Sequence, residues 1–230
     1  MSEAKVDQVW KRNRMVILNR LWKKEPEMVR TASIADFLDG KPPRSMTLDM
    51  GCGDTGKINI KLNHLYHGID VSLVAIRAAK RKSPNANFLV ADASYLPFRD
   101  NSFDRVASYS VIESLGVEFR EAFRELVRVT NNEISFTTMH VDAIYKPNTS
   151  AENQYLKLSY ATIHIETGLV GTTPEQMMGM LRDSEIEIDF RVIDNTGKET
   201  GINAVDYLNG LDDQSKKHIV LNAKKTIEQK

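Results

Sequence analysis

The sequence contains a single cysteine, Cys52, among its 230 residues. An internal disulfide is therefore excluded, and we expect a reducing compartment and a cytoplasmic chain. No stretch approaches the roughly 20 consecutive apolar residues of a membrane-spanning helix, so no membrane span is expected. Acidic and basic residues number 31 each, which leaves no net charge. This balance argues against a protein that holds a polyanion by bulk charge.

The stretch Thr47–Gly56 joins an apolar strand to a glycine-rich turn. Gly51, Gly53 and Gly56 have the spacing G-x-G-x-x-G, which lets a backbone turn tightly after a strand and approach a bound ligand closely. Cys52 lies within this turn, where we expect it to act as a small packing residue and not as a nucleophile.

The next predicted strand ends in an aspartate. Tyr66–Asp70 is predicted to be a strand, and Asp70 comes 19 positions after Gly51. This is the offset at which an acidic residue binds both hydroxyls of a ribose in a βαβ nucleotide site. Alternatively, Asp70 caps the helix predicted at Leu73–Arg81, and one carboxylate could serve both purposes.

Strands and helices alternate through the first 140 residues, which predicts a parallel sheet with helices on both faces. Ligands of such sheets bind beyond the carboxyl ends of the strands. The other predicted elements are strands at Met46–Met50, Asn87–Asp92, Phe103–Ser110 and Glu133–Met139, and a helix at Phe119–Val129.

Four stretches occur in a characteristic order: LDMGCGDTG (48–56), GIDVS (68–72), VADASYLPF (90–98) and FDRVASYSVIESL (103–115). Together they make the sequence resemble the class I S-adenosylmethionine-dependent methyltransferases that act on small molecules. The resemblance implies a doubly wound, Rossmann-like α/β fold. Its sheet would have seven mostly parallel strands, an antiparallel last strand and helices on both faces. Glu187–Ile193 and Ile219–Ala223 fit the final two strands.

The resemblance also implies one methyltransferase domain over residues 1–230. Residues 1–44 would form a helical cap and 45–140 the cofactor-binding core. Residues 141–172 exceed a usual connection in length, which suggests a lid over the substrate. Residues 173–230 would supply a helix and the last two strands, and Thr173 and Gln176 predict a capping box at the start of that helix.

At the methionine end of the cofactor, the resemblance assigns roles to the glycine turn. Asp49 would help to fix this turn and the amino group of the cofactor. Gly51 and Gly53, with Cys52 between them, would pass under the methionine and ribose portions. The usual third glycine of the family stands one position earlier, where this chain has Thr55.

At the nucleoside end, the resemblance assigns Asp70 to the ribose hydroxyls and Val71 to packing on the adenine. Asp92 and Ala93 would read the adenine edge, through a carboxylate and a backbone amide. S-adenosyl-L-methionine is therefore the expected cofactor, and no metal is expected.

Methyl transfer from a sulfonium requires mainly that the acceptor be held close and in line. The backbone of Ser108 and Tyr109 would meet the methionine end. A base is needed only if the acceptor arrives protonated. Tyr109, Glu113 and His140 are candidates, and for each the alternative is an ordinary packing or binding role.

Three other functions stay open. A nicotinamide-dependent dehydrogenase would also use the glycine spacing, but the carboxylate of Asp49 would repel a nearby pyrophosphate. An RNA-modifying methyltransferase could hold phosphates with the basic N-terminal helices. A non-catalytic homologue would bind the cofactor without turnover. With no appended RNA-binding module recognised, a small-molecule acceptor is the preferred hypothesis.

Overall fold

The computed structural model describes the core of the chain. The described residues are 45–54, 65–139, 141–144, 155–159, 161–164, 169–173, 175–176, 179–180, 191–192 and 219–225. The helical cap expected at 1–44, most of the helix expected at Lys57–Leu65, and the candidate base His140 lie outside these residues. The division of the chain into segments stays a prediction.

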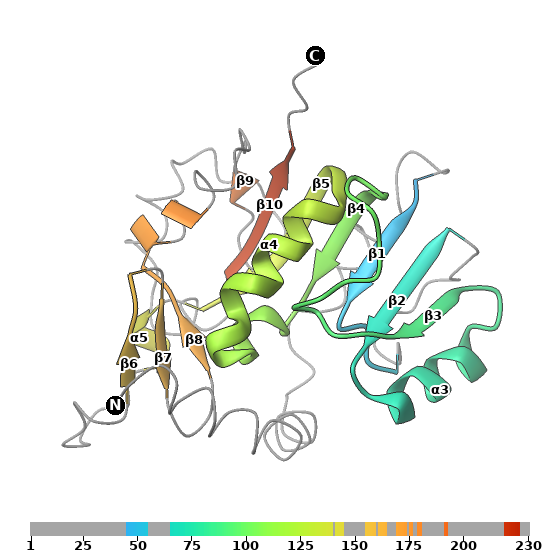
Figure 1. The fold of residues 1–230 in the computed structure, drawn as a ribbon, viewed down its shortest axis with the longest axis horizontal. Helices are drawn as coiled ribbons and strands as arrows, with labels where there is room; N and C mark the ends of the chain where they lie inside the picture. The colour runs from blue at the N-terminus through green and yellow to red at the C-terminus, as the bar shows by residue number, and fades with distance from the viewer. Residues whose placement is uncertain are drawn as a thin grey trace.

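One twisted sheet organises the described part, with strand order β3-β2-β1-β4-β5-β10-β9 (Figure 1). Strands β1 to β5 are parallel, β10 runs antiparallel to β5, and β9 runs antiparallel to β10. The predicted mostly parallel α/β sheet is thereby confirmed. Only two residues of β9 are described, so seven full strands stay a prediction. The strands are β1 (Thr47–Met50), β2 (Tyr66–Asp70), β3 (Asn87–Val90), β4 (Phe103–Ser108), β5 (Thr130–Thr138), β9 (Arg191–Val192) and β10 (Ile219–Lys224).

The strand order reverses at β1, which has β2 on one side and β4 on the other. Because β1 to β5 are parallel, their carboxyl ends lie along one edge of the sheet. In open α/β sheets this reversal leaves a crevice at that edge in which ligands bind. The glycine turn follows β1 directly, so the fold places it at the switch point.

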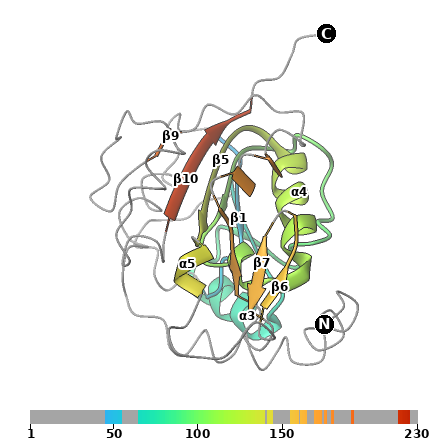
Figure 2. The same cartoon turned by 90° about the vertical axis from the view of Figure 1, so that its left-hand side faces the viewer.

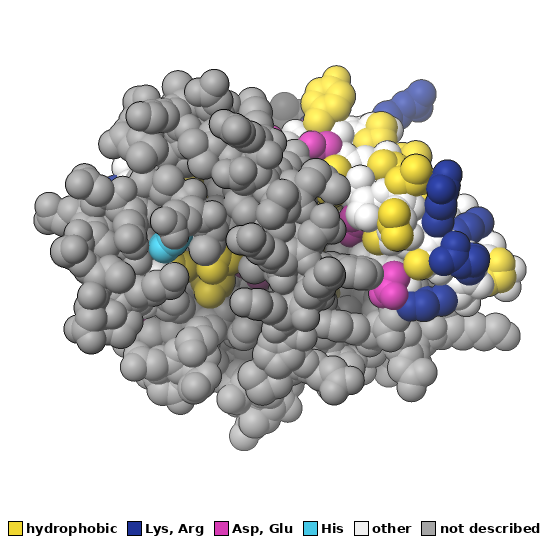
Figure 3. Space-filling model, turned by 90° about the horizontal axis from the view of Figure 1, so that it is seen from below, with side chains coloured by type: hydrophobic (Ala, Val, Ile, Leu, Met, Phe, Trp, Pro, Cys, Tyr) yellow, Lys and Arg dark blue, Asp and Glu magenta, His cyan; other side chains and the backbone are white. Residues whose placement is uncertain are grey.

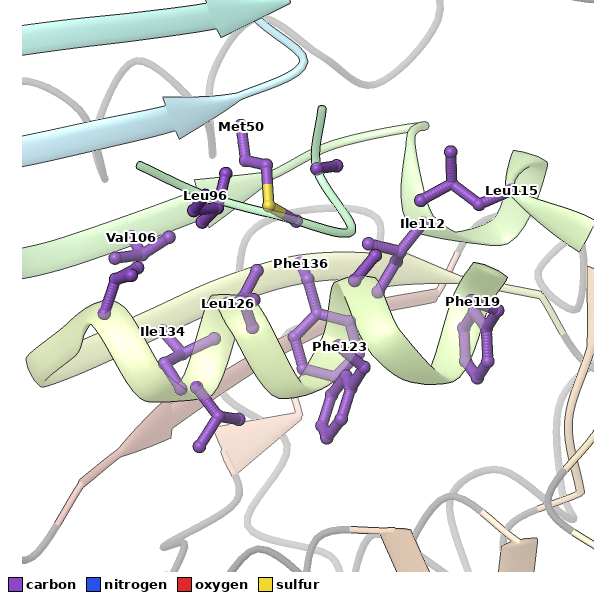
Figure 4. Close-up of a cluster of buried hydrophobic side chains, with 14 of the residues drawn as sticks. Met50, Leu96, Val106, Ile112, Leu115, Phe119, Phe123, Leu126, Ile134 and Phe136 are labelled. Atoms are coloured by element: carbon purple, nitrogen blue, oxygen red, sulfur yellow. The ribbon is translucent and has the colours of Figure 1, made fainter. Parts of the chain in front are cut away.

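Helix α4 (Phe119–Val129) has the bounds predicted from its apolar spacing and covers one face of the sheet. Its buried side chains pack against Met50 of β1, Val106 of β4 and Phe136 of β5 (Figure 4). The rings of Phe123 and Phe136 meet edge to face, with centroids 5.5 Å apart. Helix α3 (Leu73–Lys82) connects β2 to β3 and buries a separate set of residues, Ala75, Ile76 and Ala79.

A hydrogen-bonded clamp ties the loop after β3 to α4. Arg128 donates to the carbonyl oxygens of Phe98 (2.8 Å) and Leu96 (3.2 Å) and to the carboxylates of Asp100 and Glu125. Glu125 in turn accepts from the backbone N–H of Leu96 at 2.6 Å. The loop after β3 is therefore held by side chains from one turn of α4.

We expect Arg128→Met to lower the free energy of unfolding by about 1–3 kcal/mol at neutral pH, because charge-assisted hydrogen bonds to the loop are lost. The hydrogen bond from Arg128 lowers the pKa of Glu125, so this stabilisation is lost as pH falls through the depressed pKa. Denaturant unfolding at neutral and acidic pH tests this. Arg124→Met, an exposed arginine of the same helix, is the control, and equal losses in both variants would contradict the clamp.

The segment expected to be a lid contains regular structure of its own. It includes a short helix, α5 (Val141–Ile144), and an antiparallel three-stranded sheet of β6 (Tyr155–Lys157), β7 (Thr162–His164) and β8 (Val170–Gly171). Ile163 and Val170 join the same buried cluster as Phe119 of α4. Figures 1 and 2 both show this small sheet beside the start of α4.

Both ends of segment 141–172 lie at the carboxyl end of β5. Val141 N–H donates to the carbonyl of Thr172 (3.1 Å), and Thr172 N–H donates to the carbonyl of Met139 (3.0 Å). The predicted capping box follows and is confirmed, with reciprocal bonds between Thr173 and Gln176. Within the described ranges, no helix is both long enough and apolar enough to cross a membrane.

Candidate active site

The glycine turn after β1 is fastened to the end of β2. The backbone N–H groups of Gly51 and Cys52 both donate to the carbonyl of Ile69, at 2.8 and 2.9 Å. Gly51 and Gly53 have φ angles of 83° and 57°, a region that favours glycine. A Cβ on Gly51 would lie only 2.1 Å from Cγ2 of Val111. Glycine is therefore required at position 51 by both its backbone angle and its neighbour.

Asp70 connects this turn to the start of α3. Its Oδ2 accepts from the N–H of Gly53 at 3.0 Å, and its Oδ1 accepts from the N–H of Ser72 at 2.8 Å. The cap of α3 is Ser72, whose hydroxyl accepts from Ala75 N–H, so the alternative role of Asp70 as the cap itself is wrong. Each carboxylate oxygen still has a lone pair with which to accept from a ribose hydroxyl.

Burial raises the pKa of Asp70, while the hydrogen bonds from Ser72 and Gly53 lower it less strongly. Without ligand, its contribution to stability is thus present at low pH and lost as pH rises through the raised pKa. Ligand hydroxyls need the ionised form as acceptor. We therefore expect cofactor affinity to fall on acidification, starting at a higher pH than for an ordinary aspartate. Calorimetric titrations between about pH 4 and 7 measure this. Asp70→Asn should flatten the profile, and an unchanged profile would contradict the assignment.

The expected adenine-reading residues follow the adjacent strand. Asp92 Oδ1 accepts from Ser94 N–H at 2.9 Å, and its carbonyl accepts from Tyr95 N–H at 3.1 Å, which fixes the turn after β3. Ala93 is buried within this turn. The N–H of Ala91 donates to the carbonyl of Asp70 at 3.2 Å, so the two acidic strand ends lie next to each other.

Asp49 lies on β1 with only 5% of its surface exposed. The hydroxyl of Tyr66, on the neighbouring β2, donates to Asp49 Oδ2 at 2.6 Å. Tyr66 lies outside every motif that the sequence displays. Asp49 pairs with Gly68, and Tyr66 lies two positions earlier on the same face, so the register of the two strands brings the pair together.

The end of β4 contains Ser108 and Tyr109, both buried. The hydroxyl of Ser108 is fully buried and has no hydrogen-bond partner within the described part of the chain. The hydroxyl of Tyr109 is hydrogen-bonded to that of Ser135 on β5. Burial raises the pKa of Tyr109, and the bond to Ser135 offsets this only in part. Because this phenol stays neutral and is already hydrogen-bonded, the structure favours the packing role of Tyr109 over the base role.

Cys52 and Glu113 are two further buried side chains near the carboxyl ends of the strands. Burial, and then the charge of Asp49, raise the pKa of Cys52, so its thiol stays protonated, in keeping with a packing role. Glu113, in a short helical turn (η1, Ile112–Ser114), is 3% exposed and accepts from the hydroxyl of Thr137 at 2.8 Å. Among the described residues, no group of three or more His, Cys, Asp or Glu is placed to hold a metal ion.

A family model described as a methyltransferase domain matches residues 48–135. A solved S-adenosylmethionine-dependent methyltransferase from Methanosarcina mazei is 25% identical, with a TM-score of 0.55 over 85% of this chain and 98% of that one. Residues 48–135 therefore form a methyltransferase domain of the class I S-adenosylmethionine-dependent type. The magnesium protoporphyrin IX methyltransferase of Synechocystis, solved with bound S-adenosylhomocysteine, has the same fold at 14% identity (TM-score 0.56; 98% of this chain, 100% of that chain).

Relatives of this methyltransferase include enzymes named for tRNA and for a quinone. The Arabidopsis thaliana tRNA (carboxymethyluridine(34)-5-O)-methyltransferase is 33% identical over 128 residues, 55% of this chain and 31% of that protein. The demethylmenaquinone methyltransferase of Renibacterium salmoninarum is 39% identical over 62 residues, 27% of this chain and 26% of that protein. The chain thus spans about a third or less of the length of these relatives.

The residues of this methyltransferase fit the cofactor of its family. Asp70 offers two acceptors beside a glycine turn at the switch point of the sheet, as a ribose requires. Val71, the residue after Asp70, is 36% exposed and lies outside the core, so its side chain can pack on the flat adenine. The hydroxyl of Ser108, buried and without a hydrogen-bond partner among the described residues, marks a polar position at the end of β4, where the methionine portion is expected.

Proposed function

We propose that the chain transfers a methyl group from S-adenosylmethionine to a tRNA nucleoside, and that the acceptor atom is a carboxylate oxygen. The observation that carries the methyl-transfer part is Asp70, bonded to both the glycine turn and the start of α3. The acceptor class is supported by the tRNA methyltransferases among the relatives, which match the longer stretches of this chain. This ranks RNA above the small molecule that the sequence alone favoured.

S-adenosylmethionine supplies a methyl group already activated on a sulfonium sulfur. The carbon–sulfur bond breaks as the carbon–oxygen bond forms, and the electron pair stays on sulfur. A carboxylate acceptor arrives deprotonated, so no base is needed. This agrees with a Tyr109 whose phenol stays neutral and bonded to Ser135. The role left to the protein is to hold donor and acceptor in line.

Two features of the described residues support an RNA acceptor. The outer side of α3 carries exposed cationic side chains, which Figure 3 shows beside exposed hydrophobic ones. Such cations bind phosphates with an affinity that falls with added salt. The small sheet β6-β7-β8 adjoins the carboxyl end of β5, in a position to contact an acceptor. The exposed cationic residues are Arg77, Lys80, Arg81 and Lys82.

The test is transfer from methyl-tritiated S-adenosylmethionine to tRNA that carries carboxymethyluridine at position 34. A methyl ester is hydrolysed by mild alkali to volatile methanol, whereas methyl groups on nitrogen or carbon stay on the RNA. We expect RNA-bound tritium that becomes volatile after alkali. Label that stays on the RNA would refute the carboxylate acceptor while keeping the RNA. No label on any tRNA would refute both.

A small-molecule acceptor is the second candidate, favoured by the similarity to demethylmenaquinone methyltransferases. The same assay tests it with demethylmenaquinone, chemically reduced to its hydroquinone and held in detergent micelles, in place of tRNA, because the ring carbon is nucleophilic only in the reduced form. Methylation of the quinone alone, insensitive to added salt, would establish this alternative. Binding of S-adenosylhomocysteine without transfer to either acceptor would support a non-catalytic homologue.

A further inference from the structure

From the buried pair that it forms with Asp49, we infer that Tyr66 is a positioning residue for the amino-acid end of the cofactor. Its hydroxyl holds the Asp49 carboxylate where it can receive the ammonium group. The inference rests on the proposed function, because it concerns the same cofactor site. It adds a residue outside the motifs that carry the family resemblance.

The register of the neighbouring strands β1 and β2 brings the pair together. Asp49 of β1 is the register partner of Gly68 of β2, and Tyr66 lies two residues before Gly68 on the same face. The phenol therefore reaches along this face, and its hydroxyl donates to Asp49 Oδ2 at 2.6 Å. Tyr66 and Asp49 are 4% and 5% exposed, so solvent does not compete for this bond.

The tyrosine ring is held in place by its surroundings. The ring of Phe88, on β3, packs against it with centroids 5.9 Å apart and a tilt of 59°. A Cβ on Gly68 would lie 2.8 Å from both the Phe88 ring and the sulfur of Cys52, so glycine leaves the room that this packing uses. Because the ring is held in place, its hydroxyl keeps the Asp49 carboxylate in one position.

The charges around Asp49 indicate which group it serves. Burial, then the charge of Asp49, raise the pKa of Tyr66, so the phenol stays a neutral donor and leaves the negative charge on the carboxylate. The same charge adds to the effect of burial on Cys52 and Tyr109. Asp49 thus acts at the glycine turn and the end of β4, where the methionine portion is expected. An ammonium is the cofactor group that a fixed, buried carboxylate would attract.

Two ligands separate positioning from general support of the site. S-adenosylhomocysteine carries the amino-acid end, whereas 5′-methylthioadenosine lacks it and keeps the ribose and adenine. We expect Tyr66→Phe, which keeps the ring, to weaken the binding of S-adenosylhomocysteine about five- to tenfold, which is less than the loss of one direct charge-assisted hydrogen bond, because the hydroxyl acts through Asp49. Binding of 5′-methylthioadenosine should change less than about twofold. Calorimetric titration with each ligand gives the ratio.

A double-mutant cycle tests whether Tyr66 acts through Asp49. In an Asp49→Asn background, Tyr66→Phe should lose most of its effect on S-adenosylhomocysteine. Tyr95→Phe, which removes the hydroxyl of an 82% exposed tyrosine, is the control and should change neither affinity. Equal weakening of both ligands, no weakening of either, or an undiminished effect in the Asp49→Asn background would each overturn the inference. Failure of the wild type to bind S-adenosylhomocysteine would instead refute the proposed cofactor site.

Discussion

Replacing Asp70 by alanine should weaken the binding of S-adenosylhomocysteine about 100-fold or more. The carboxylate is expected to accept from both ribose hydroxyls, and each hydrogen bond to a charged group contributes about 1.5–3 kcal/mol. The substitution also removes the acceptor of the Gly53 N–H and loosens the glycine turn. Calorimetric titration of the purified variant measures the change in the dissociation constant.

Asp54→Ala provides a matched control for this prediction. Asp54 lies next to Gly53 in the same loop, and its carboxylate forms a surface ion pair with Lys82 at 2.6 Å. Losing that pair should change affinity by less than about threefold, because exposed ion pairs contribute little. Comparable losses in both variants would show that the loop and not the Asp70 carboxylate determines affinity.

Gly51→Ala should lower the free energy of unfolding by about 3 kcal/mol or more. The residue has a φ of 83°, which costs alanine about 1–2 kcal/mol, and the added Cβ would lie 2.1 Å from Cγ2 of Val111. Denaturant unfolding of the variant measures the loss. Gly179→Ala is the control, since a Cβ there would meet nothing within 4 Å.

Val111 offers a way to divide this cost into its two causes. Val111→Ala removes the methyl groups that the new Cβ would strike, but leaves the backbone angle of position 51 unchanged. The double variant should therefore be more stable than the sum of the single changes implies, with the cost of the positive φ remaining. Strict additivity would mean that the contact with Val111 is not the cause of the loss.

Much of this site could be predicted from the sequence because its determinants are local. Gly51 and Gly53 were expected to make a tight turn, and both have positive φ angles. The bounds of Phe119–Val129 followed from apolar spacing, since one face of that helix is buried. The capping box of Thr173 and Gln176 was readable for the same reason: it involves four consecutive residues.

What the sequence did not indicate depends on contacts between distant residues. The pair of Tyr66 and Asp49 exists only through the register of two strands. The burial of Tyr109 against Ser135 depends on β5 lying beside β4. Strand β5 begins at Thr130 and not at the expected Glu133, because the chain passes directly from the end of α4 into the sheet. The small sheet within 141–172 has strands too short for their apolar pattern to be read.

The central claim is that this chain binds S-adenosylmethionine through the turn after β1 and Asp70. Parallel calorimetric titrations of the wild-type chain with S-adenosylhomocysteine and with NADH test it most directly. We predict saturable, one-to-one binding of S-adenosylhomocysteine and no binding of NADH, since Asp49 stands where a pyrophosphate would approach. Binding of NADH alone would contradict the account and restore the dehydrogenase alternative.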